Sequence, residues 1–354
     1  MEEEIDISKY LLHPYSDDED SSISFKETES TTSDCTRHSG SNYDDCYSTV
    51  NLLSILQYHV SSKELEKKIE NENDRTVISK IVTNLKGHFC SLIYGKRTNY
   101  FMSALIRKST KQDKIEILKE ITKDIPRMVK NEFASYPIQE FIKNTSSIEE
   151  IAYILNPITN EFYFVEICNH QCGTHVIQTI ITLIHEKFRH KMNMLILSNL
   201  NSILYNMNGI CVVVKLITTT ENEKTISFLL SYFTSKLVHF SKNKYINYAI
   251  QALIKRVGNI STEFLTDIKQ CTLSNFFELS TNQFGNYIVK LILNYVDNRV
   301  KQKIFETLKD KGFVFYLFNN KYSRCIIYKL IKGFDPNSRK KCLFSIKNKQ
   351  NSLI

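Results

Sequence analysis

The sequence predicts an all-α fold of the solenoid class, in which one helical unit is stacked repeatedly on itself. A short segment recurs seven times along the 354 residues, at steps of 36 to 39 residues. The first residues of these copies, called position 0 here, are Asn99, Ser135, Thr174, Ile210, Asn247, Asn286 and Arg324. A fixed period in this range indicates a repeat protein built from one supersecondary unit. Such units contact only their neighbours and bury one continuous core.

Each copy is expected to form a helix that begins near position 0. Apolar residues fall at positions +2, +3, +6 and +7, as with Ala249, Ile250, Leu253 and Ile254 in the fifth copy. This spacing follows one face of an α-helix and not the alternation of a strand. The second copy carries Pro137 at position +2, which suits only the first turn of a helix.

A second amphipathic stretch precedes each copy, such as KIEILKEITKDIPRMV before the second and EKTISFLLSYFTSKLV before the fifth. Each unit is therefore predicted to contain two main helices, with room for a short third turn between them.

Positions 0, +1 and +4 are the candidate binding positions, and we expect them to share one exposed helical face. There an amide or hydroxyl, an aromatic ring and a second polar group recur. The candidate residues are Asn99, Tyr100, Ser103, Ser135, Tyr136, Gln139, Thr174, His175, Gln178, Asn247, Tyr248, Gln251, Asn286, Tyr287 and Lys290. An amide can pair with the Watson–Crick edge of a base, and a ring can stack between two bases. The pattern favours single-stranded RNA, read at one base per unit.

The segments NQFGNYIVK, NKYINYAIQ and NEFASYPIQ resemble the repeat helices of the Pumilio, or PUF, family of RNA-binding proteins. The resemblance extends from about residue 75 to about residue 335. It implies a crescent-shaped α-solenoid of Pumilio-type repeats whose concave face binds single-stranded RNA, with the C-terminal repeat at the 5′ end of the site. By the family's base code, it also implies that Asn247 with Gln251 reads uracil and that Ser135 with Gln139 reads adenine.

Two copies depart from this pattern. The fourth has Ile210, Cys211 and Val214 at the three binding positions. We therefore expect it to stack on a base and to keep the spacing between its neighbours, but not to form hydrogen bonds to a base edge. The seventh has Arg324, Cys325 and Tyr328, and it is either a repeat or a C-terminal cap. No copy has the Ser-plus-Glu pair by which the family reads guanine.

Charge divides the chain into two parts. Residues 1–50 hold 13 acidic and 3 basic residues, whereas residues 51–354 hold 25 acidic and 43 basic residues. The first part, rich in Ser and Thr, is predicted to be a disordered tail. The second is predicted to be a Pumilio homology domain, whose basic character suits a polyanion. We expect an N-terminal cap or degenerate repeat in residues 51–90, repeats in residues 90–335 and a C-terminal tail in residues 336–354.

Several classes of protein find no support in the sequence. It has no apolar run of membrane-spanning length and no signal-peptide layout at its first residues. Its nine scattered cysteines fit a reducing compartment. No phosphate-binding loop, HExxH helix or GxSxG elbow occurs, and the CNHQC cluster at residues 168–172 lacks a second pair of zinc ligands. We therefore expect no enzyme activity, no cofactor and no metal.

Three functions are compatible with these observations. By the resemblance, the first is a monomeric, cytoplasmic binder of mRNA 3′ untranslated regions that regulates stability or translation by recruiting deadenylase or repressor proteins. The second is a nucleolar PUF-like ribosome-biogenesis factor that binds pre-rRNA with looser sequence choice. The third is a protein-binding solenoid of the armadillo or HEAT kind, against which the recurring ring and amides argue.

Overall fold

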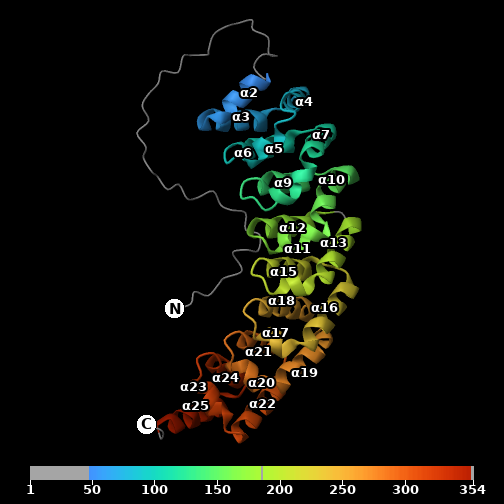
Figure 1. Ribbon diagram of the computed structural model, residues 1–354. Coiled ribbons are helices and arrows are strands. Elements are labelled where there is room, and N and C mark those ends of the chain that lie inside the picture. Colours follow the sequence, from blue (N-terminus) through green and yellow to red (C-terminus); the bar gives the residue numbers. More distant parts are fainter. Residues whose placement is uncertain (1–47, 185, 352–354) are drawn as a thin grey trace, which may run out of the picture. The chain divides into compact units, whose positions relative to one another are not determined.

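The structure, a computed structural model, describes residues 48–184 and 186–351, and these form helices and connecting turns without a β-strand (Figure 1). The predicted acidic tail, residues 1–50, lies almost wholly outside the described residues. The chain divides into two compact units between Leu195 and Ile196, and each is described by itself.

The first unit is built from α2 to α13, the last of which ends beyond the division. The bounds are α2 (Thr49–Gln57), α3 (His59–Asn71), α4 (Arg75–Asn84), α5 (Phe89–Tyr94), α6 (Thr98–Lys108), α7 (Lys111–Ile121), η2 (Thr122–Asp124), α8 (Ile125–Met128), α9 (Ser135–Lys143), α10 (Ile148–Ile158), α11 (Glu161–Asn169), α12 (Gln171–Leu183) and α13 (Glu186–Ser198).

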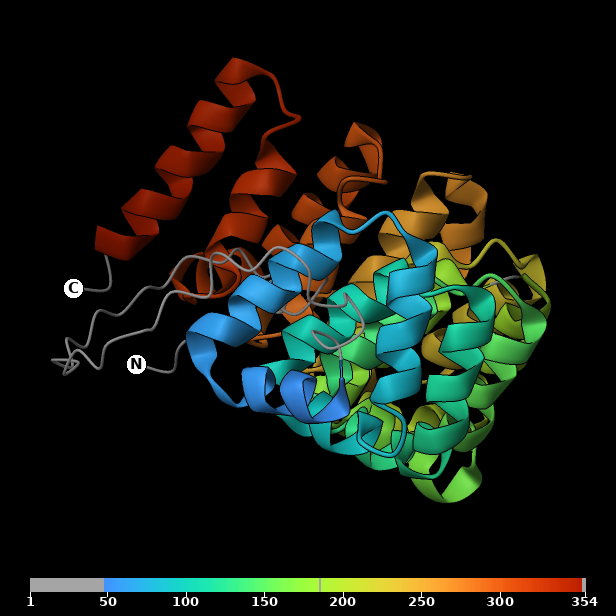
Figure 2. The same ribbon diagram turned by 90° about the horizontal axis from the view of Figure 1, so that it is seen from above.

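The second unit continues the same pattern and ends with a longer helix, drawn red in Figure 2. The bounds are α14 (Leu200–Leu204), α15 (Gly209–Thr219), α16 (Glu223–Ser235), α17 (Leu237–Ser241), α18 (Ile246–Gly258), η3 (Thr262–Leu265), α19 (Thr266–Ser274), α20 (Phe276–Thr281), α21 (Gly285–Ile292), α22 (Asn298–Asp310), α23 (Phe313–Asn319), α24 (Arg324–Ile331) and α25 (Pro336–Asn351).

Each complete repeat has three helices, as α7, α8 and α9 illustrate. The long helix α7 starts with a capping box: Thr110 Oγ1 accepts from the backbone N–H of Asp113, whose carboxylate accepts from the backbone N–H of Thr110. The short helix α8 has Pro126 in its first turn, where proline is tolerated. The third helix of each repeat begins near position 0 and is called the register helix. The predicted pair of main helices with a short turn between them is confirmed.

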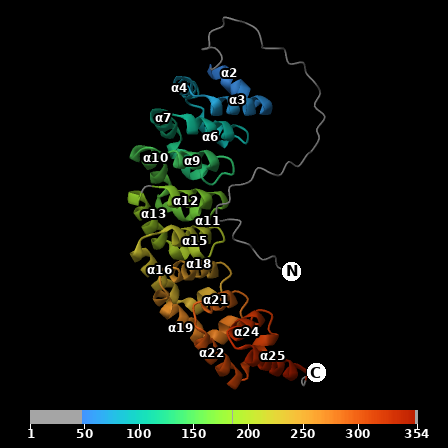
Figure 3. The same cartoon turned by 180° about the vertical axis from the view of Figure 1, so that it is seen from behind.

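In each unit the register helices form one layer. In the first unit α6 packs against α9 and α9 against α12, while α15, α18, α21 and α24 pack in the same serial way in the second (Figures 1 and 3). The seventh copy has the same three helices, α22 to α24. Before the first copy, α3 packs against α6 as α6 does against α9.

The predicted apolar positions form the core. In α6, Phe101, Met102, Leu105 and Ile106 are fully buried, and the equivalent residues of α15 and α18 are fully buried too. Burial of such side chains contributes about 1.5–3 kcal/mol each.

Ion pairs one period apart join consecutive repeats. Lys130 Nζ lies 2.5 Å from Glu166 Oε1, and Lys242 Nζ lies 2.6 Å from Glu278 Oε1. Both lysines stand at position −5 of their copy, and both glutamates at position −8 of the next. Exposed pairs of this kind contribute only about 0–1 kcal/mol each to stability. No helix in the part of the chain that is described has the length and apolarity needed to cross a membrane.

Candidate nucleic-acid interface

A side-chain turn at position −4 fixes the start of the register helices. In the second copy, Asn131 Oδ1 accepts hydrogen bonds from the backbone N–H groups of Phe133 and Ala134, both at 2.9 Å. The same double contact recurs at Asn206, Asn243, Asn282 and Asn320. These contacts satisfy N–H groups that have no partner inside the helix. Sequence reasoning missed this position, although asparagine occupies it in five of the seven copies.

The third and first copies have a different residue at position −4. In the third, His170 Nδ1 accepts from the backbone N–H of Cys172 at 3.2 Å, so the ring is a cap. Burial and the nearby charge of Lys130 lower the pKa of His170, which favours the neutral ring that this contact needs. In the first copy, a Cβ on Gly95 would lie 2.1 Å from Thr98 Oγ1, so glycine leaves room for that hydroxyl.

The asparagine side chains at position 0 have a fixed orientation. In Asn99, Asn247 and Asn286, the side-chain Nδ2 donates to the backbone carbonyls at positions −4 and −3, at 2.8–3.0 Å. Both hydrogens of the amide are therefore engaged. The remaining polar atom, Oδ1, is a hydrogen-bond acceptor whose position is set by the start of the helix.

The expectation that positions 0, +1 and +4 share one exposed helical face is wrong for position 0. Position 0 is buried in six copies, whereas the rings of Tyr100, Tyr136 and Tyr287 at position +1 are 56%, 44% and 37% exposed. His175 and Tyr248, also at position +1, are half-buried.

Helical geometry explains this graded exposure. Since an α-helix turns by about 100° per residue, position 0 lies about 20° from the apolar position +7, while position +1 points almost directly away from the core. Position +4 falls between them.

The polar groups at position +4 turn toward position 0 of the same copy. Gln251 Nε2 donates to Asn247 Oδ1 at 2.9 Å, and Gln178 Nε2 donates to Thr174 Oγ1 at 3.4 Å. In the second copy, Gln139 Oε1 instead accepts a hydrogen bond from the hydroxyl of Thr179 in the next repeat, at 3.1 Å. Its Nε2 donates to the backbone carbonyl of Ser135 at 3.4 Å.

The first and sixth copies carry other groups at position +4. Ser103 Oγ donates to the backbone carbonyl of Asn99 at 2.9 Å. In the sixth copy, Lys290 Nζ lies 4.1 Å from the ring centroid of Tyr287, which is a cation–π contact.

Two buried acceptors at these positions have no hydrogen-bond partner: Asn99 Oδ1 and Gln178 Oε1. A buried polar atom left without a partner costs about 1–3 kcal/mol, and such atoms are uncommon in folded proteins. Both belong to the candidate site, so a ligand that donates hydrogen bonds there would remove that cost.

The fourth copy presents neither a ring nor a polar side chain. Ile210, Cys211 and Val214 are all buried, with Cys211 only 1% exposed. The Cys211 thiol donates to the Met207 carbonyl at 3.5 Å, and burial raises its pKa to about 11. The expectation that this copy can stack on a base is therefore wrong, because its position +1 is covered.

The seventh copy keeps an exposed ring, but at position +4, where Tyr328 lies. Arg324 at position 0 is exposed, and its Nε donates to the Phe318 carbonyl at 3.0 Å. This copy therefore has the repeat's backbone with different side chains at the binding positions.

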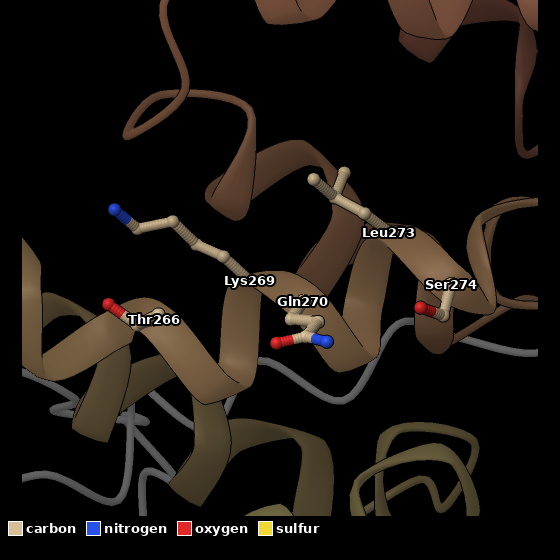
Figure 4. A pocket seen from close by; sticks show the side chains of 5 residues that line it. All are labelled: Thr266, Lys269, Gln270, Leu273 and Ser274. Carbon is tan, nitrogen blue, oxygen red and sulfur yellow. The ribbon is translucent and has the colours of Figure 1, made fainter.

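One hollow in the second unit contains none of the candidate residues. A hollow along α19 is lined by five side chains of that one helix (Figure 4): Thr266, Lys269, Gln270, Leu273 and Ser274. None of these is a candidate residue. In residues 48–184 and 186–351 there is also no group of three His, Cys, Asp or Glu side chains placed to hold a metal ion.

Comparison with known proteins identifies the fold and the family. A family model described as a NOP9-like PUF repeat domain matches residues 18–312. Pumilio homolog 12 of Arabidopsis thaliana is 20% identical over 291 residues, which are 81% of this chain and 48% of that protein. Suppressor protein MPT5 of Saccharomyces cerevisiae is 23% identical over 251 residues, 69% of this chain and 28% of that protein. The chain thus spans less than half the length of these two relatives.

Solved structures show the same fold. PUF-8, in complex with PBE-RNA, matches with a TM-score of 0.73 at 16% identity over 86% of this chain and 88% of that one. The Puf4 RNA-binding domain, bound to the HO endonuclease RNA 3′ UTR recognition sequence, matches with a TM-score of 0.71 at 18% identity, over 84% and 92%. Because the family model covers most of the sequence, this chain belongs to the family of NOP9-like PUF repeat domains.

Proposed function

We propose that this chain binds single-stranded RNA and selects its sequence by contacts at positions 0, +1 and +4 of the register helices. The observation that carries this proposal is the fixed acceptor at position 0 beside a ring at position +1. It recurs at Asn99, Asn247 and Asn286, each followed by a tyrosine. A protein-binding surface has no need for this combination in register.

The side chains of the fifth copy support the selection of a base in the following way. Asn247 Oδ1 can accept from the N3–H of uracil, because its own amide hydrogens are engaged elsewhere. Gln251 Nε2 uses one hydrogen on Asn247 and keeps a second for a uracil carbonyl. The ring of Tyr248 then stacks on a base and contributes about 1–3 kcal/mol.

The unpaired acceptors support the same role in the first and third copies. Asn99 Oδ1 and Gln178 Oε1 are buried without a partner, so a base donor there gains a hydrogen bond without breaking one. Neither atom is accessible in the free protein, and a base edge must displace neighbouring side chains to reach it.

Relatives and family suggest two biological settings. The Puf4 structure contains a 3′ UTR recognition sequence, which supports an mRNA regulator. By the family resemblance, such a regulator works in the cytoplasm with deadenylase or repressor proteins. The NOP9-like family model and the absence of any reader at Ile210, Cys211 and Val214 favour the alternative, a nucleolar ribosome-biogenesis factor that binds pre-rRNA with looser sequence choice. In both settings the chain acts as a binding module without catalysis.

Selection of RNA ligands from a random pool, followed by a salt titration with scrambled competitor, tests the proposal. A selective binder keeps a large specificity ratio at all salt concentrations, whereas a general binder shows mainly a salt slope. If no RNA is retained at moderate salt, the proposal is wrong and the protein-binding solenoid stands. Crosslinking in cells, with sequencing of the bound RNA, then decides between mRNA and pre-rRNA.

A further inference from the structure

The helix α3 ends in the same way as three of the register helices. Its C-cap, Glu72, has φ −73° and ψ 129° and lies 37 residues before Ser109, the C-cap of α6, which has φ −64° and ψ 142°. The C-caps of α12 and α15, Ile184 and Thr220, have the same extended backbone. These three C-caps stand at position +10 of their copies, so the shared end places position 0 of α3 at Ser62.

A hydrogen bond between neighbouring helices gives the same register. Lys108 Nζ, at position +9 of the first copy, donates to the backbone carbonyl of Glu72 at 3.1 Å. In the second unit, Arg256 Nη2 at position +9 of the fifth copy donates to the carbonyl of Thr220 at position +10 of the fourth, also at 3.1 Å. The helix α3 therefore lies against α6 in the register in which α15 lies against α18.

Burial along α3 agrees with this register. Leu65 and Ile69, at positions +3 and +7, are buried, and so is Ser62 at position 0. An ion pair between Arg107 Nη2 and Glu70 Oε1, 2.7 Å apart, joins position +8 of α6 to position +8 of α3. Positions +2 and +6 of α3 hold charged residues. For this reason the apolar spacing that marks the seven copies does not reveal α3 in the sequence.

The three binding positions of α3 hold Ser62, Lys63 and Glu66. Ser62 is buried, Lys63 is exposed and Glu66 is half-buried, which is the gradation of exposure found in the second and sixth copies. Tyr100, at position +1 of the neighbouring helix α6, is also exposed. Burial and the negative charge of Glu70 raise the pKa of Glu66, so hydrogen bonds to the ionised carboxylate would offset part of that cost.

A carboxylate at position +4 selects a base by the hydrogens that the base offers. An ionised glutamate only accepts hydrogen bonds, and it has two oxygens. On the Watson–Crick edge of a single-stranded base, guanine alone presents two adjacent donors, N1–H and the N2 amino group. Each of the other three bases has an acceptor beside its donor. Hydrogen bonds to a charged acceptor are stronger than those between neutral groups, and none of the seven copies has a carboxylate at position +4.

We propose that α3 is the register helix of a further copy, in which Glu66 and Ser62 select guanine. This inference rests on the proposed RNA binding and names the base that one more position of that site takes. The carboxylate of Glu66 accepts from N1–H and from the N2 amino group, and the short side chain of Ser62 leaves more room for a purine than an asparagine would. In the direction that the family resemblance implies, this guanine lies two places beyond the adenine opposite the second copy, on its 3′ side.

The first test compares RNAs that share the selected core, extended by two nucleotides, and differ only in the last base. Unmodified full-length protein should bind the guanine RNA about tenfold or more tightly than the adenine RNA, since hydrogen bonds to a charged group are lost. Inosine, which keeps N1–H but lacks the N2 amino group, should give an intermediate affinity. This comparison changes the RNA alone, so the folding of a variant does not enter.

The second test changes the base that α3 prefers. Glu66→Gln gives α3 the combination of the second copy, Ser135 with Gln139, so the preference should switch from guanine to adenine. The quantity to compare is the ratio of the two affinities, because removing a negative charge strengthens the binding of any RNA. Glu64→Gln is the matched control: Glu64 is exposed at position +2 of the same helix, and the variant should keep the guanine preference. Thermal melting should be nearly normal for both variants.

The outcomes separate this inference from the proposed function. If unmodified protein binds no RNA, the proposed function itself fails. If it binds RNA with equal affinity for all four bases at this position, α3 selects no base, and the inference is wrong while RNA binding stands. A guanine preference that survives in a normally folded Glu66→Gln protein would also overturn it, because another residue would then make the contacts. If that variant melts early, the inosine RNA decides, since equal affinities for inosine and guanine contradict the contact to the N2 amino group.

Discussion

The fourth and fifth copies share one scaffold and differ at the positions where a ligand would be contacted. Both α15 and α18 bury apolar residues at positions +2, +3, +6 and +7. Both begin after an asparagine turn, at Asn206 and Asn243. At positions 0, +1 and +4, however, α15 carries buried Ile, Cys and Val, whereas α18 carries Asn, Tyr and Gln. The comparison teaches that one set of positions folds the repeat and a separate set contacts the ligand.

Core truncation should have the largest effect and should treat the two helices alike. Leu216 and Leu253 occupy position +6 and are fully buried. Leu216→Ala and Leu253→Ala should each lower the free energy of unfolding by about 2–5 kcal/mol, because a cavity remains. Denaturant titration measures this loss, and RNA affinity below the unfolding transition should be unchanged. A much smaller loss for Leu216→Ala would show that the two copies do not share a scaffold.

Making α18 resemble α15 should abolish base contact with little loss of stability. The variant Asn247→Ile, Tyr248→Cys, Gln251→Val introduces side chains that α15 already accommodates at the same positions. RNA affinity should fall about 10- to 100-fold, as expected for a lost stack of about 1–3 kcal/mol, while the melting temperature changes little. Cys211→Ala in α15 is the control and should leave RNA affinity unchanged.

The single change Tyr248→Ala separates stacking from packing. Tyr248 is half-buried, so it could serve either purpose. A stacking ring predicts weaker RNA binding with a nearly normal melting temperature. A variant that melts as early as Leu253→Ala but binds RNA normally while folded would sink the assignment of this ring to the RNA interface.

The two copies should also differ in their tolerance of base changes. By the family's code, the preferred core is 5′-U-U-N-(A/U)-A, with uracil opposite Asn247 and Gln251, and the unread base opposite Ile210. Replacing that uracil should weaken binding about tenfold, since one or two hydrogen bonds of about 0.5–1.5 kcal/mol are lost. Replacing the unread base should have no measurable effect. A strict UGUA core recovered from a random pool contradicts the assignment.

The sequence predicted the helices and their buried residues well, because the period and the apolar spacing are properties of each copy's own residues. The burial of Ala249 and Ile250 follows from spacing alone. The burial of Asn247 could also have been derived, because position 0 lies at the edge of the apolar arc. The orientation of its amide could not, since it depends on carbonyls released by the turn at Asn243. The covering of Cys211 depends on how neighbouring helices pack, which composition does not encode.

The asparagine turn shared by the two copies should have a moderate effect. Asn243→Ala removes the acceptor for the N–H groups of Tyr245 and Ile246. It should lower the free energy of unfolding by about 1 kcal/mol, as for other helix caps, and should weaken RNA binding because Asn247 is held by the same turn. Asn206→Ala should cost similar stability but leave RNA affinity unchanged. Equal losses of affinity in both variants would show that the turn acts on binding only through global stability.

The smallest expected effect is a pH dependence in the third copy, where His170 takes the place of the asparagine in the turn. His170 caps α12 through Nδ1, and its pKa in the folded protein is lowered from 6.5 by burial and by Lys130, against the opposing effect of Glu166. The neutral ring is therefore favoured by folding, so its stabilisation is complete above about pH 6.5 and is lost as the pH falls toward the folded pKa. His170→Asn supplies the cap of the other copies without a titrating group. Denaturant titrations at about pH 7.5 and pH 5.5 should show a smaller drop in unfolding free energy for the variant. His175, whose pKa burial also lowers, contributes the same residual drop to both proteins. Parallel pH profiles would mean that the Nδ1 contact does not stabilise α12.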